Sequence, residues 1–196
     1  MKTLMIASLT LLLAVPALAQ LDNSIGIFFS ESDLTMDNTN FDPTVGTPFD
    51  AWIALLETTV PTVGGYEVGI TVDPNLLATV VEGPSGWTNF GSNFNHLAGY
   101  GVPLPADGAD IILCHFVLIY LVDTPSDIVM GPAEPSSVGG EGPAITDGDS
   151  PDILVVCNYT SGPDFGGLVA TLYGMGIDFP VPVQSRSLSG VKALFD

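Results

Sequence analysis

The sequence predicts an all-β protein: a single-domain, two-sheet antiparallel β-sandwich of the jelly-roll or immunoglobulin-like kind. Two observations predict this class. Several segments alternate apolar and polar residues with a period of two, which is typical of half-buried antiparallel strands. These segments are short and are separated by Gly, Pro, Asn and Asp, so about seven to nine strands fit into the chain. No convincing long helix precedes the C-terminal segment.

Each predicted strand has its own apolar face. Phe49, Ala51, Ile53 and Leu55 share one side of 48–57, and Asp50 and Trp52 share the other. The remaining strands are expected at 25–29, 66–72, 111–122, 153–157 and 168–173. Between them lies the Gly- and Pro-rich excursion 131–152, which we expect to be irregular except for a short strand near 144–146.

The chain ends suggest three parts. A basic start, an apolar run from Leu4 to Val15 and a small-residue cleavage pattern at Ala17–Ala19 predict a signal peptide over 1–19. The sandwich is then expected over 20–175, and a Pro-linked C-terminal tail over 176–196. Leu188, Val191, Leu194 and Phe195 fall at helical spacing in that tail, which fits either a sorting signal or a loosely docked terminus. We therefore expect a secreted protein, extracellular or at the cell surface, with the periplasm as an alternative.

The charge balance is strongly acidic, with a formal net charge of −19. After the predicted signal peptide, the sequence has 22 carboxylates and only two basic residues, Arg186 and Lys192. Nucleic acids are excluded as partners, because their recognition needs clustered Lys and Arg. No segment after the signal peptide is long and apolar enough to span a membrane.

One stretch resembles the front half of cohesin domains. PFDAWIALLETTVPTVGGYEVGITVDPNLL contains Val60-Pro61, Gly64-Gly65, Asp73-Pro74 and Leu76-Leu77 in the order found there, and IILCHFVLIYLV is similar to the long central strand that follows. The resemblance covers about 45–125. It implies a jelly-roll sandwich related to cohesins and to some carbohydrate-binding modules of secreted bacterial proteins, and cohesins bind dockerin modules through one sheet face.

The most suggestive local composition for a binding site is GWTNFGSNFNHLAGYG at 86–101. Aromatic rings can stack on sugars while amides bond their hydroxyls. The candidate residues are Trp87, Asn89, Phe90, Phe94, His96 and Tyr100. The alternative is a hairpin whose aromatic side chains fill the core, and the sequence favours this alternative.

Three further groups are candidates for local chemistry. Asp147, Asp149 and Asp152 could supply part of a calcium site, although they lack EF-hand spacing and a solvated acidic loop is the alternative. Cys114 and Cys157 are both predicted to face the core, where a disulfide is slightly favoured over two free thiols. His115 lies mid-strand, and His96 is expected in a loop.

No catalytic constellation is recognisable, and we expect no enzyme: metal-spaced His pairs, a nucleophile elbow and Cys-x-x-Cys are missing. The sequence thus predicts a secreted, non-catalytic sandwich that binds an extracellular protein or takes part in cell-surface assembly. The alternatives are a carbohydrate-binding module and a calcium-stabilised structural domain.

Overall fold

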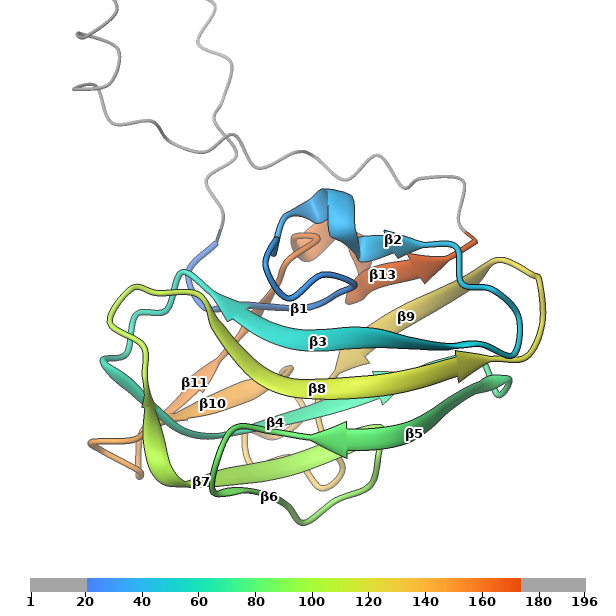
Figure 1. Cartoon of the computed structure of the whole chain (residues 1–196). Helices are drawn as coiled ribbons and strands as arrows, with labels where there is room; N and C mark the ends of the chain where they lie inside the picture. Colours follow the sequence, from blue (N-terminus) through green and yellow to red (C-terminus); the bar gives the residue numbers. More distant parts are fainter. Residues whose placement is uncertain (1–20, 174–196) are drawn as a thin grey trace, which may run out of the picture.

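A computed structural model describes residues 21–173, which form two β-sheets packed face to face (Figure 1). The predicted signal peptide and C-terminal tail lie outside the described residues. In the first sheet, sheet A, five strands follow one another in space: β12 (Asn158–Tyr159), β1 (Ser24–Phe28), β3 (Pro48–Leu56), β8 (Ile111–Tyr120) and β5 (Leu76–Glu82). The neighbours are antiparallel except β12 and β1. The predicted sandwich class is confirmed.

The second sheet, sheet B, has eight strands and branches at β4 (Thr62–Thr71). One side of β4 pairs with β7 (Asn95–Pro105), which also pairs with β6 (Trp87–Asn89). The other side pairs first with β10 (Ala144–Asp147) and then with β9 (Ser126–Gly131). Beyond these, β11 (Leu154–Val156) pairs with β10, and β13 (Leu168–Leu172) lies between β9 and β2 (Asn40–Phe41). The short strand expected near 144–146 is β10.

Helical structure within the described range is limited to two 3-10 turns, Met36–Thr39 and Pro163–Phe165. None of the helices between residues 21 and 173 has the length and apolar character needed to cross a membrane. Sheet packing therefore provides the stability of this part of the chain.

The core lies between the sheets, and the period-two pattern predicts it well. Phe49, Ala51, Ile53 and Leu55 are all buried, as the alternation predicts. The pattern fails at one point of β8, because the register with β3 shifts between Ile53 and Ala54. Leu113 is the extra residue of this bulge, so it is buried together with Cys114. Ile112, which strict alternation places beside Cys114, packs outside the sheet instead.

Two buried tyrosines and a histidine form the polar part of the core. The Tyr66 hydroxyl oxygen lies 2.7 Å from His96 Nδ1, and His96 Nε2 lies 2.9 Å from the Asn93 carbonyl oxygen. This carbonyl can only accept, so His96 donates from Nε2 and accepts the Tyr66 hydroxyl proton at Nδ1. Tyr100 donates its hydroxyl to the Leu113 carbonyl oxygen at 3.0 Å. His96 is thus a fully buried strand residue of β7 rather than a loop residue.

The two cysteines are free thiols, so the predicted disulfide is wrong. The prediction that both face one core is confirmed, because Cys114 and Cys157 belong to the same buried cluster. Alternation could not show how far apart their strands lie. Cys114 is on β8, and Cys157 immediately precedes β12, three strand positions away. At about 4.8 Å per strand this separation is about 14 Å, beyond the roughly 7 Å that a disulfide tolerates between Cα atoms.

Burial raises the pKa of both thiols to about 12. Since the thiolate is the reactive form, we expect Cys114 and Cys157 to resist aromatic disulfide reagents at pH 8 in the folded protein. Unfolding without reductant should expose two titratable thiols per chain. Finding no thiol under those conditions would contradict the free-cysteine arrangement.

The buried His96 predicts a loss of stability in mild acid. Burial lowers the pKa of His96 below the ordinary value of 6.5. Between these two pKa values the unfolded chain is protonated at His96 and the folded chain is not. This contribution to the free energy of unfolding is fully present above pH 6.5 and falls as the pH drops towards the folded pKa, by at most about 1.4 kcal/mol per pH unit for one proton. Denaturant unfolding at pH 7.5 and 5.5 should show the loss.

The matched control is the second histidine. His96→Gln should reduce the loss of stability between pH 7.5 and 5.5, whereas His115→Gln should increase this loss, because the raised pKa of His115 favours the folded chain more at pH 5.5 than at pH 7.5. An equal pH dependence in both variants would refute the role of His96.

Candidate functional site

The outer face of sheet B is covered by the excursion that follows β9. Glu67 points outward from β4, yet it is only 6% exposed because this loop lies over it. The backbone N–H of Ser137 donates to both carboxylate oxygens of Glu67, at 2.9 and 3.1 Å. The Asn95 side chain and the Glu134 backbone exchange two hydrogen bonds of 2.8 Å. At Gly69 the loop approaches so closely that a Cβ would lie 2.4 Å from the Pro132 carbonyl oxygen. The loop therefore covers this face over β4 and the start of β7.

The outer face of sheet A is covered only in part by residues 21–173. Leu34, from the segment after β1, packs against a small apolar cluster outside the sheet, which consists of Phe28, Ala54, Leu56 and Ile112. The bulge at Leu113 supplies Ile112 to this cluster. The cover ends there, and no segment of residues 21–173 lies over the rest of β3 and β8 or over β5 (Figure 1).

Strand register defines the uncovered part, which we call the open face. Directly paired residues share a face of a sheet, and the pairs form three rows across β3, β8 and β5. The rows are Pro48–Ile119–Leu77, Asp50–Val117–Val80 and Trp52–His115–Glu82. Six of the nine residues are apolar. Leu77 and Val80 are 44% and 40% exposed, so apolar side chains reach solvent next to a charged corner.

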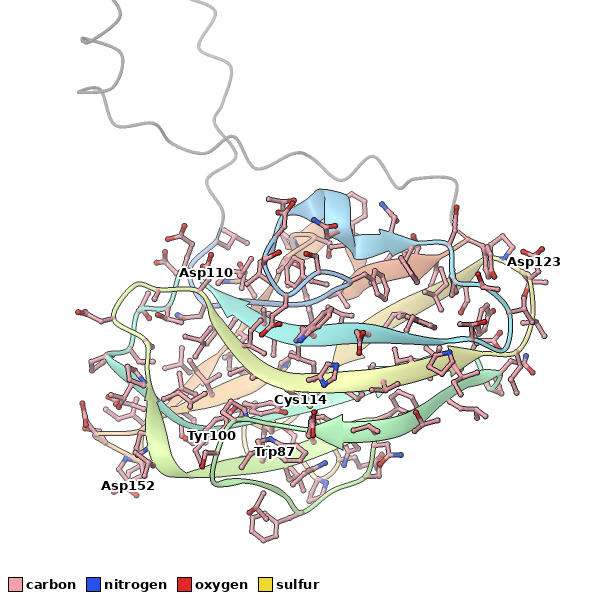
Figure 2. The ribbon with its side chains drawn as sticks, viewed as in Figure 1. Trp87, Tyr100, Asp110, Cys114, Asp123 and Asp152 are labelled. Atoms are coloured by element: carbon pink, nitrogen blue, oxygen red, sulfur yellow. The ribbon has the colours of Figure 1, made fainter. Side chains whose placement is uncertain are left out.

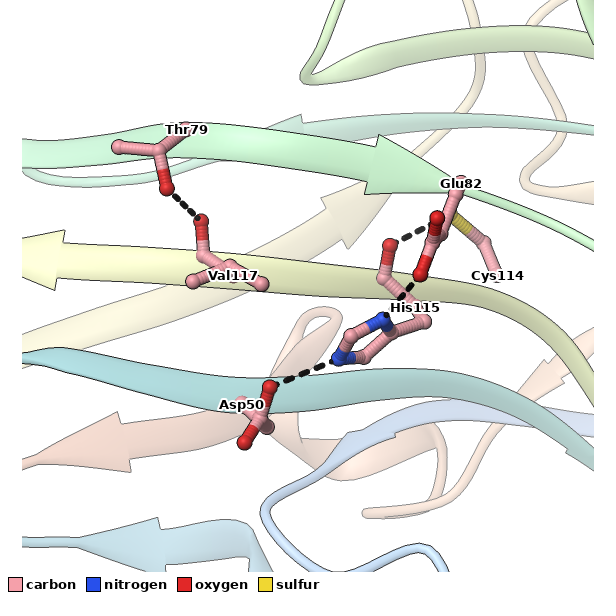
Figure 3. Close-up of polar contacts among 6 residues, drawn as sticks. All are labelled: Asp50, Thr79, Glu82, Cys114, His115 and Val117. Carbon is pink, nitrogen blue, oxygen red and sulfur yellow. Dashed lines mark hydrogen bonds and ion pairs between the residues drawn. The ribbon is translucent and has the colours of Figure 1, made fainter.

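The charged corner is a histidine held between two carboxylates (Figure 3). His115 Nε2 lies 2.9 Å from Asp50 Oδ1, and its Nδ1 lies 3.1 Å from Glu82 Oε1. The Trp52 ring stacks on the imidazole with 5.2 Å between centroids. Burial by itself lowers the pKa of His115, but the hydrogen bonds to Asp50 and Glu82 outweigh this effect and raise it above 6.5. The corner thus stabilises an imidazolium that donates from both nitrogens.

The aromatic segment 86–101 forms the β6–β7 hairpin and its connection rather than a flat platform. His96 and Tyr100 are buried, and Phe94 stacks on Phe116 of the core. The Trp87 ring lies against Gly83, where a Cβ would meet it at 2.2 Å, and packs on the core from its half-buried position (Figure 2).

The other two members of this candidate sugar site lie in the turn. Asn89 accepts hydrogen bonds from the N–H groups of Gly91 and Leu97 and donates to the Ser92 carbonyl, so its amide stabilises the turn. Phe90 projects into solvent with 79% of its surface exposed. The segment therefore supplies one exposed ring, and its other aromatic side chains pack inward, as the core-filling alternative expects.

The acidic loop connects β10 to β11. Asp147 accepts a hydrogen bond from the Asp149 N–H at 2.9 Å, which is an Asx-turn. Within residues 21–173, no three His, Cys, Asp or Glu side chains gather as a metal-binding group, so Asp147, Asp149 and Asp152 do not form one.

Sequence reasoning missed the charged corner. Asp50, Glu82 and His115 come from three strands, and period two shows only that Asp50 and His115 each lie opposite an apolar face. Their proximity depends on the pairing of β3 and β5 with β8, which the sequence does not display. The available signal was that His115 is in phase with Val117 and Ile119, on a face that stays partly exposed.

No protein-family model matches the sequence, and no curated protein does. Among solved structures, 16 chains match. The sixth cohesin of Acetivibrio cellulolyticus scaffoldin B, solved in complex with a Cel5 dockerin, is similar with a TM-score of 0.50 and 8% identity over 78% of this chain and 98% of that chain. A cohesin module of a Clostridium perfringens family 33 glycoside hydrolase gives a TM-score of 0.47 and 10% identity, over 69% of this chain and 89% of that one. A type II cohesin from the A. cellulolyticus cellulosome gives 0.47 and 14%, over 71% and 91%. The likeness to the scaffoldin cohesin concerns the fold: residues 21–173 have a cohesin-like β-sandwich.

Proposed function

We propose that this chain is a secreted, non-catalytic binding module that docks a folded partner protein on the open face. The observation that carries the proposal is the difference between the two outer faces. The loop after β9 covers part of sheet B, whereas β3, β8 and β5 present six apolar side chains that no segment of residues 21–173 covers. Exposed apolar patches with a polar border are typical of protein–protein interaction sites.

Charge defines the partner further. Asp50 and Glu82 border the open face, and the sequence has no Lys or Arg between Thr3 and Ser185. A partner with an apolar strip beside Lys or Arg side chains would match both the shape and the sign of this surface. The cohesin-like fold supports a protein as the ligand class, because the scaffoldin cohesin of A. cellulolyticus was solved with a dockerin bound.

The test uses the expected secreted form, residues 20–196, as bait for extracellular proteins and on a glycan array, with calcium and with chelator. The partner is then purified and its affinity measured by calorimetry. We expect Leu77→Lys with Val80→Lys to weaken binding at least tenfold, because the double variant places two cations opposite a basic partner and removes apolar contact. Val102→Lys is the matched control: Val102 is an apolar side chain of β7 in sheet B, 72% exposed.

A partner that binds the double variant as tightly as the unchanged chain would refute the docking site. Binding to glycans alone would favour the carbohydrate-binding alternative, and binding lost in chelator would indicate the calcium-stabilised one. Glycan binding would support the carbohydrate-binding alternative only if Phe90→Ala, a change at the exposed aromatic residue, abolishes that binding.

The charged corner makes the charge of the open face depend on pH. The imidazolium partly neutralises Asp50 and Glu82, so the face becomes more acidic as the pH rises through the raised pKa of His115. In an NMR titration of the His115 ring, Asp50→Asn and Glu82→Gln should each lower this pKa, because each removes one of the two anionic acceptors. In the unchanged chain, contacts between the open face and Lys or Arg side chains of a partner should strengthen above the pKa of His115, where the face is more acidic. A His115 pKa unchanged in both variants would contradict the bracketed geometry.

A further inference from the structure

The edge strand β11 has backbone groups that no neighbouring strand uses. Antiparallel pairing with β10 places Val155 opposite Ile145, and the Asp147 N–H donates to the Ile153 carbonyl. Because backbone groups alternate in direction along a strand, those of residues 153, 155 and 157 point towards β10. The N–H and C=O groups of Leu154 and Val156 therefore point away from the sheet, and the described strands include none on that side.

The side chains on this edge are apolar and exposed. Ile153, Leu154 and Val156 have 51%, 41% and 37% of their surface in solvent, while Val155 packs against the core. An unpaired edge with apolar side chains is a template for an added strand. Natural edges are protected by extreme shortness, charged side chains or bulges.

The other edges within residues 21–173 are shorter, more polar or interrupted. The outermost strands β2 and β12 have two residues each. The edge strand β6 has three residues, as β11 does, but two of them, Thr88 and Asn89, are polar. The edge strand β5 is interrupted by a register shift between Ala78 and Val80 and ends in a charged residue, Glu82. On β11 the three apolar residues are contiguous, and neither a bulge nor a charged side chain interrupts them.

The charges around β11 indicate the occupant. Asp147, Asp149 and Asp152 lie in and beside the turn that leads into the strand. The only Lys and Arg residues after Lys2 are Arg186 and Lys192, and both lie in the C-terminal segment 174–196. The same segment contains Val183, Leu188 and Val191, which could contact an apolar edge. This segment is the only part of the chain with charge complementary to the β11 turn.

We propose that β11 receives the C-terminal segment of a second copy of this chain as an added strand, with Arg186 and Lys192 beside the acidic turn. Main-chain bonds to Leu154 and Val156 would supply the register, as in other cases of strand addition. This site is separate from the open face, because it lies in the other sheet.

The position of the last strand favours a second copy over the same molecule. Tyr173, immediately after β13, packs on Tyr120 with 6.0 Å between ring centroids. This end of the sandwich carries Asp123, and the opposite end carries Asp152 beside β11 (Figure 2). A segment that starts beside Tyr120 must pass along the sandwich, about the length of the ten-residue strand β8. That is about 33 Å, or roughly ten fully extended residues. The 23-residue segment is long enough for this path, but ordering about ten residues without a strand partner would cost backbone conformational entropy at each of them. When two copies lie end to end, the end of one sandwich where β13 finishes meets the end of the next sandwich that carries β11, so no such path is needed.

The test uses residues 20–196 with one added cysteine, Ser189→Cys, that carries a nitroxide spin label. The buried Cys114 and Cys157 should remain unlabelled, because burial raises the pKa of both to about 12. Spin-labelled chain at natural isotope abundance is mixed with ¹⁵N-labelled chain without the spin label. We expect the amide signals of residues 153–156 to broaden. No broadening at β11, or broadening only when both labels are on one molecule, would overturn the proposal.

Variants at both partners provide the second measurement, by sedimentation equilibrium. Leu154→Lys with Val156→Lys should lower the self-association constant at least tenfold, and the control Val102→Lys should leave it unchanged. Arg186→Glu with Lys192→Glu changes no residue of the described strands and should produce a similar loss of self-association, which separates the proposal from misfolding of the edge variant. A chain that stays monomeric up to millimolar concentration, or an association constant that neither double variant changes, would refute the added strand.

Discussion

Between Thr3 and Ser185 the sequence contains no lysine or arginine, and this constraint shapes the polar structure of the sandwich. Every carboxylate in residues 21–173 must be hydrated or accept hydrogen bonds from neutral groups or from histidine. Glu67 is the clearest example, since it is buried on the outer face of β4 and accepts from the backbone of Ser137 and the hydroxyl of Ser136. Burying an unpaired charge is costly unless hydrogen bonds replace the lost water. The loop over sheet B is therefore held where it supplies those donors.

His115 has the corresponding role on the other sheet. It is the one described side chain that forms ion-pair contacts, and it contacts two carboxylates at once. Both outer faces thus carry an acidic residue close to the sheet, but the two solutions differ. On sheet B the backbone of a loop satisfies the acid and covers the face around it. On sheet A a side chain within the sheet satisfies two acids, which leaves the apolar residues beside them uncovered.

The sequence predicts the strands well, because burial of one face gives a period of two that needs no knowledge of the partners. Phe49 to Leu55 and Tyr66 to Ile70 are examples. It predicts less where two strands must be placed side by side. The bulge at Leu113 moves Ile112 to the outer face, and the distance between Cys114 and Cys157 depends on the order β12-β1-β3-β8-β5. Composition also left two interpretations of the aromatic segment open, because it does not show that a residue such as His96 bonds polar partners inside the core.

The order of strands also separates the two ends of the described residues, Leu21 and Tyr173. β1 begins beside the β10–β11 end of the sandwich, and β13 ends beside Asp123 at the opposite end (Figures 1 and 2). A pulling force applied between Leu21 and Tyr173 would run along the strands rather than across them. Hydrogen bonds of antiparallel pairs lie perpendicular to the strands, so the pairs β1–β3 and β9–β13 would be loaded in shear, with many bonds sharing the load at once. Such a sandwich could transmit tension between Leu21 and Tyr173 without unzipping one bond at a time.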